Sequence, residues 1–175
     1  EEKQIVRKAA LTDLLSTICE KTYFKTPVIV NEAVNKNHPT ANSVNSRSKI
    51  VIGLLRSELE PNLGLAGAGQ EVSILRSTLI RTGILDTKNG VPKINLHPHD
   101  YLMANLLGEI EKFVQEAREQ KMNFAELYAR LTTDKCYIGL RKGLVPIYVA
   151  AVFHEYKKEI ILYDKFSQIP LNNDT

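Results

Sequence analysis

The sequence predicts a mainly α-helical protein with short β-hairpins, arranged as two winged-helix-like units in tandem. Three observations support this: apolar residues recur at helical spacing, each half ends in a strand-turn-strand pattern, and no apolar run approaches the roughly 18 residues that span a bilayer. The 175 residues, 43% hydrophobic and 25% charged, suffice for a core without disulfides or structural metals. A single α+β helical domain is the alternative.

The first predicted unit covers residues 1–96. Its helical segments are 3–22, about 50–59 and 70–82, and a hairpin follows over 84–96. The first helix ends before Pro27, because the residue preceding a proline avoids helical geometry. Asn89 and Gly90 lie between two short apolar runs and both tolerate positive φ, as a hairpin turn requires.

The second predicted unit covers residues 97–175 and repeats this order. Its helices are expected over 99–120, 123–131 and 143–156, and its hairpin over 159–170 with a turn at Asp164-Lys165. Asn123 is the predicted cap of the middle helix. The repeat is architectural, since the halves share no residue motif. The chain starts without methionine and its helical pattern begins almost at once, so we expect it to be part of a larger protein.

Charge distinguishes the two halves. Lys and Arg number 13 against 9 acids in residues 1–96, and 10 against 11 in residues 97–175, so the net charges are +4 and −1. Neither half is strongly basic, but the first is suited to weak DNA contact or to one part of a larger DNA-binding surface. With no signal-peptide pattern, the sequence predicts a cytoplasmic protein in which Cys19 and Cys136 are reduced core thiols.

Candidate nucleic-acid contacts lie in the polar run 31–48 and just beyond it. This run is rich in Asn and Ser and contains Lys36 and Arg47, and Lys49 follows it. Such amides, hydroxyls and cations contact DNA phosphates and base edges. Lys88 at the first hairpin tip is the fourth candidate. The alternative is a solvated loop with helix caps, since Asn and Ser favour both.

A second candidate site is the string His97-Pro98-His99-Asp100. Two imidazoles and a carboxylate would hold a divalent metal if a third element supplied another ligand, which would make the chain a small metal-dependent hydrolase. The alternative is that Asp100 begins a helix, where a carboxylate is electrostatically favoured. No metal-ligand spacing or nucleophile motif accompanies the string. We therefore predict no metal, no other cofactor and no catalytic residue.

Two strings carry a resemblance to a known family. Residues 23–35 read YFKTPVIVNEAVN, and residues 138–147 read IGLRKGLVPI. Together they resemble the region downstream of the P-loop module in very large bacterial ATPases, including those of BREX-type phage-defence systems.

This resemblance implies an accessory helical, winged-helix-like region, with ATP hydrolysis in a P-loop module that this sequence lacks. Asn31 and Glu32 would cap the short helix after Pro27. Arg141 would contact a neighbouring domain or a nucleotide. The implied partners are DNA or sibling domains of the parent ATPase, with no membrane and no small-molecule substrate.

Overall fold

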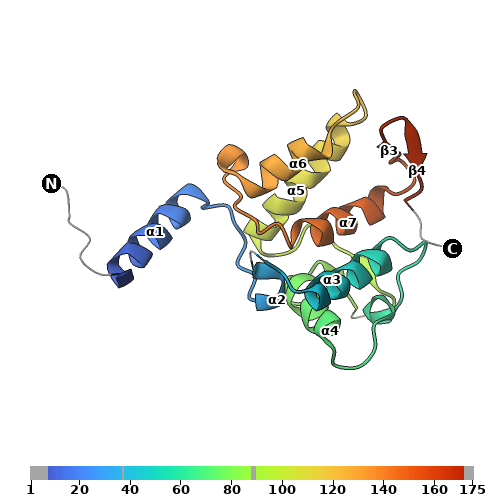
Figure 1. Cartoon of the computed structure of the whole chain (residues 1–175). Coiled ribbons are helices and arrows are strands. Elements are labelled where there is room, and N and C mark those ends of the chain that lie inside the picture. The colour runs from blue at the N-terminus through green and yellow to red at the C-terminus, as the bar shows by residue number, and fades with distance from the viewer. Residues whose placement is uncertain (1–7, 37, 88–89, 172–175) are drawn as a thin grey trace.

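The computed structural model describes residues 8–36, 38–87 and 90–171, and it is mainly helical with two short antiparallel strand pairs (Figure 1). This confirms the predicted helical class with short hairpins. The helices are α1 (Lys8–Thr22), α2 (Glu32–Asn35), α3 (Ala41–Leu54), α4 (Gln70–Leu75), α5 (Tyr101–Glu116), α6 (Phe124–Thr132) and α7 (Val145–Tyr156). The strands are β1 (Leu85–Asp86), β2 (Lys93–Ile94), β3 (Leu162–Asp164) and β4 (Ser167–Ile169). Short turns are η1 (Pro61–Gly64), the π-helical η2 (Arg76–Ile80) and η3 (Asp134–Cys136).

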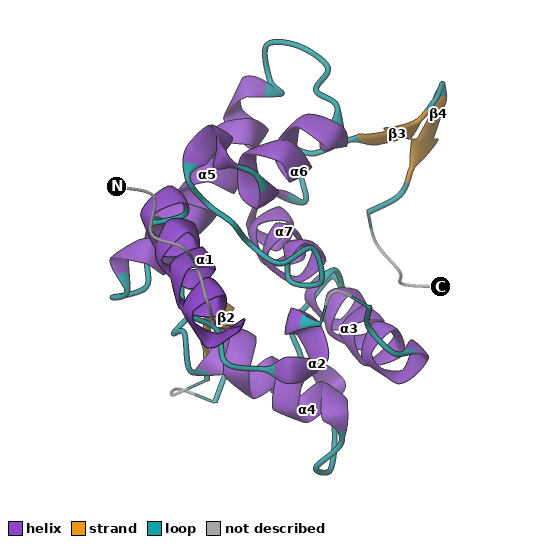
Figure 2. Cartoon of the chain, turned by 60° about the vertical axis from the view of Figure 1, so that its left-hand side comes forward, coloured by secondary structure: helices purple, strands orange, loops and turns teal. Residues whose placement is uncertain are grey.

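Both predicted hairpins form. In the first, Leu85 pairs with Ile94, and its turn residues Lys88 and Asn89 lie outside the described residues. In the second, Asp164 pairs with Ser167, so the turn is one residue later than predicted, with Lys165 at φ 54°. This second hairpin follows α7 and projects from the helical body, as Figure 2 shows.

Both halves of the chain contribute to one hydrophobic core. Helix α3 packs on α4 and on α7, and α5 packs on α6 and α7, so segments from either side of residue 96 interdigitate. Tyr148 of α7 is fully buried, and its hydroxyl donates to the Thr78 carbonyl at 3.3 Å. The predicted boundary between residues 96 and 97 is therefore not a gap in the core.

Two helices differ from the sequence prediction. Helix α3 begins at Ala41, inside the polar run that suggested a solvated loop. Thr40 caps it, and Ser43 and Ser46 are buried because their hydroxyls find partners: Ser43 contacts Thr40, and Ser46 contacts Glu71. The predicted third helix is α4 followed by a π-helical turn, rather than one continuous α-helix.

Helix α1 projects from the body and has no buried residue (Figure 1). The prediction of two core thiols is wrong for Cys19, which is exposed on this helix, because α1 buries none of its residues against the rest of the described chain. Cys136 is half-buried, and its thiol lies 3.6 Å from a Glu109 carboxylate oxygen; burial raises its pKa, and Glu109 adds to the rise. Both cysteines are free. Within the described residues, no helix combines the length and apolarity needed to traverse a bilayer.

Candidate functional site

Two segments far apart in the sequence meet at a cleft of about 1020 Å³. They are residues 23–36 and 137–144, which hold most of the two strings YFKTPVIVNEAVN and IGLRKGLVPI. The Lys25 backbone N–H donates to the Tyr137 carbonyl at 3.1 Å, and the Gly139 N–H donates to the Thr26 hydroxyl at 3.0 Å. The ring of Phe24 lies 5.0 Å from that of Tyr137, measured between centroids. The fold thus places both strings side by side in the lining of one cleft.

Glycines permit this close approach. A Cβ added at Gly139 would lie 2.6 Å from the Tyr23 ring, and one added at Gly143 would lie 2.5 Å from the Val34 carbonyl oxygen. Val34 is buried in α2, so its backbone has little room to retreat. The glycines at positions 139 and 143 are therefore explained by packing: the 139–144 loop lies against Tyr23, directly after the end of α1, and against α2.

Helix α2 is held beside the cleft by amide side chains. Asn31 caps α2 by accepting from the Ala33 N–H at 3.0 Å, and its amide nitrogen donates to the Ser77 hydroxyl at 2.8 Å. This confirms the predicted capping role of Asn31. Asn35, which lines the cleft, donates to the Ile29 carbonyl at 2.7 Å. These bonds fix the backbone that positions Lys36.

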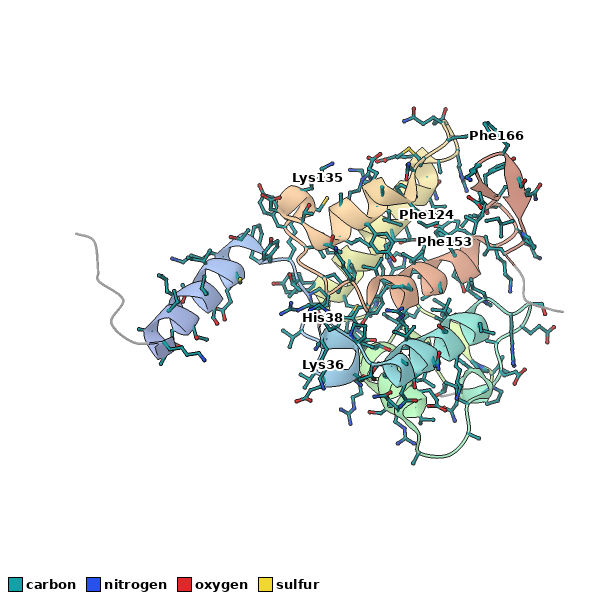
Figure 3. The ribbon with its side chains drawn as sticks, in the orientation of Figure 1. Lys36, His38, Phe124, Lys135, Phe153 and Phe166 are labelled. Atoms are coloured by element: carbon teal, nitrogen blue, oxygen red, sulfur yellow. The ribbon has the colours of Figure 1, made fainter. Side chains whose placement is uncertain are left out.

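The cleft has a positive charge excess. Among the residues that the structure describes, its lining contains four cations, Lys36, Arg47, Arg141 and Lys142, and one carboxylate, Glu20. Arg47 is half-buried, and the other three cations are exposed. Figure 3 labels Lys36 where it lies on the helical body near α2. Positive charges gathered in a concave surface attract anions, and the paired N–H groups of an arginine guanidinium match the geometry of a phosphate.

The structure therefore separates the predicted nucleic-acid residues. Lys36 and Arg47 line the same cleft, and Arg141, which the resemblance implied as a contact residue, lines it with them. Lys49 is not part of this lining: its ammonium pairs with Glu71 at 3.0 Å. A backbone hydrogen bond, and then Lys49, lower the pKa of Glu71. Lys88 lies outside the described residues.

Sequence reasoning missed Lys142 as a cleft residue. The available signal was its place next to Arg141 in the second string, before the turn in which the Leu144 N–H donates to the Arg141 carbonyl at 2.9 Å. This turn places both side chains on the cleft.

The string at residues 97–100 forms a helix entry. Asp100 caps α5, since one carboxylate oxygen accepts from the N–H groups of Leu102 at 2.9 Å and Met103 at 3.3 Å. His97 and His99 are exposed beside this cap. Among the described residues, no three His, Cys, Asp or Glu side chains are placed to hold a metal ion. The geometry confirms the helix-entry interpretation of Asp100.

Comparison with known proteins gives no relative from which to assign this cleft. No family model, no curated protein and no solved structure matches the chain.

Proposed function

We propose that this chain is a non-catalytic accessory module of a larger cytoplasmic bacterial P-loop ATPase, of the BREX phage-defence type, and that it contacts DNA through the basic cleft. The observation that supports this most is that Lys36, Arg47 and Arg141 line one cleft. That cleft is built where the two family-like strings meet. The architecture proposed for the whole chain is a tandem of two winged-helix-like units.

The chemistry expected at the cleft is phosphate binding. Each cation that neutralises a DNA phosphate releases a condensed counterion, so affinity falls as salt rises. Four contacts would lower affinity about 150-fold between about 50 and 200 mM salt. Contacts from these cations to phosphates carry no direct sequence information, so the cleft supplies affinity and position rather than sequence preference.

Fluorescence anisotropy with labelled duplex DNA at low and high salt tests this proposal. Arg47→Ala should weaken binding and reduce the slope of log affinity against log salt by about one. Lys49→Ala is the matched control: it removes the same charge from the same helix but outside the cleft. Lack of duplex binding at low salt, or equal losses in the two variants, would contradict the proposal.

Helix α1 favours a second candidate function, docking on a sibling domain of the parent ATPase. Leu11, Leu14, Leu15 and Ile18 are each 43–52% exposed, and their spacing places them on one face. Such a stripe at i, i+3, i+4 and i+7 is the pattern by which a helix enters an apolar groove. In size-exclusion chromatography, the P-loop module of the parent should co-elute with this chain. It should not co-elute with a variant that carries both Leu14→Glu and Leu15→Glu.

A further inference from the structure

A second groove lies between the helical body and the β3–β4 hairpin. Its volume is about 760 Å³, and its walls come from the end of α5, the start of α6, α7 and the hairpin. Phe113 and Phe153 are buried within it, and Phe124 is 39% exposed at its edge. The Phe124 ring centroid lies 6.2 Å from that of Phe113 and 5.9 Å from that of Phe153, and Figure 3 shows Phe124 and Phe153 together. The groove therefore has an aromatic wall with one accessible ring.

The hairpin presents two more accessible rings. Tyr163 lines the groove and is 48% exposed, and Phe166 at the hairpin turn is 99% exposed. Figure 3 labels Phe166 on this hairpin. Neither ring is needed to fill the core of this chain. Three accessible aromatic side chains thus come from α6 and the hairpin: Phe124 and Tyr163 line the groove, and Phe166 lies at the hairpin turn beyond that lining.

Cations accompany these rings. Arg118, Lys121 and Lys165 line the groove. Among the residues that the structure describes, Glu159 is the only carboxylate in this lining, and it pairs with Arg118. The ammonium of Lys121 lies 4.6 Å from the centroid of the Tyr163 ring. Within the described part of the chain, two cations, Lys121 and Lys165, therefore have no acidic counterpart in the groove lining. The surface is complementary to a polyanion that also carries flat apolar groups.

We infer that this groove binds single-stranded nucleic acid, with unpaired bases stacked on Phe124, Tyr163 and Phe166 and phosphates close to Lys121 and Lys165. Aromatic side chains beside cations are the combination by which proteins bind single strands, since every base has a π-face. A protein partner would also cover the rings, but the unmatched cations favour a phosphate-bearing chain. The inference rests on the proposed function: the basic cleft binds phosphates of DNA, and this second groove adds base stacking to that binding.

The test compares two labelled strands of equal length, an oligothymidylate and an abasic deoxyribose-phosphate strand, by fluorescence anisotropy. The wild type should prefer the strand with bases. Tyr163→Ala combined with Phe166→Ala should weaken oligothymidylate binding about tenfold or more and remove that preference. Tyr101→Ala is the control, since this ring is 75% exposed at the opposite end of α5 and should be dispensable.

Thermal melting should show all variants folded, because the substituted rings are exposed. Unchanged oligothymidylate binding in the double variant, or no base preference in the wild type, would overturn the inference and leave the groove to a protein partner. Arg47→Ala separates the two proposals: it should weaken duplex binding but leave the base preference intact. Base preference without any duplex binding would refute the proposed function alone.

Discussion

Replacing Gly143 by alanine tests whether the close contact between the 139–144 loop and α2 holds the basic cleft together. The new Cβ would lie 2.5 Å from the Val34 carbonyl oxygen, well inside van der Waals contact. The obstacle is backbone of a buried residue, so the loop must move instead of a flexible side chain. Overpacking of this kind costs about 1–3 kcal/mol. For a chain of this size, that lowers Tm by about 2–12 °C.

Thermal unfolding followed by circular dichroism measures this change. Gly108→Ala is the matched control, because nothing lies within 4 Å of its added Cβ in α5. Alanine favours a helix interior over glycine by about 1 kcal/mol, so this variant should melt slightly higher than the wild type. Equal melting temperatures for Gly143→Ala and wild type would refute the packing argument.

Two further predictions concern stability. The His154 ring donates from Nδ1 to the Leu54 carbonyl at 2.6 Å, and desolvation lowers its pKa. The folded state keeps this ring neutral, so its stabilising contribution is present above about pH 6.5 and is lost as pH falls. Thermal melting at a neutral and an acidic pH should show a smaller decrease of Tm in His154→Gln than in the wild type. An equal decrease of Tm in both would contradict this. Leu15→Ser on α1 should leave Tm unchanged, whereas Leu106→Ala should cost about 2–5 kcal/mol; a large loss in Leu15→Ser would show that α1 packs on this body.

Local signals in the sequence predict much of the fold. Asn123 caps α6 by accepting from the Ala125 N–H at 2.8 Å, as its side chain predicts. The strand pairs of both hairpins follow from short apolar runs, although the second turn lies one residue later than predicted. The start of α3 could not be predicted, because Ser43 and Ser46 read as loop residues until the partners that satisfy their hydroxyls are known. Their burial is set by tertiary contacts.

The cleft shows the same limit for function. Arg47 and Lys49 lie two residues apart on α3, and two residues turn a helix by about 200°. Their side chains therefore face opposite ways: Arg47 lines the cleft, and Lys49 reaches Glu71 on α4. Counting cations in the run 31–49 could not distinguish these two roles, because this part of α3 was predicted to be a loop and a loop does not fix the directions of the two side chains. Arg141 joins Arg47 only through the packing of residues 139–144 on α2, which depends on the absence of a side chain at Gly143.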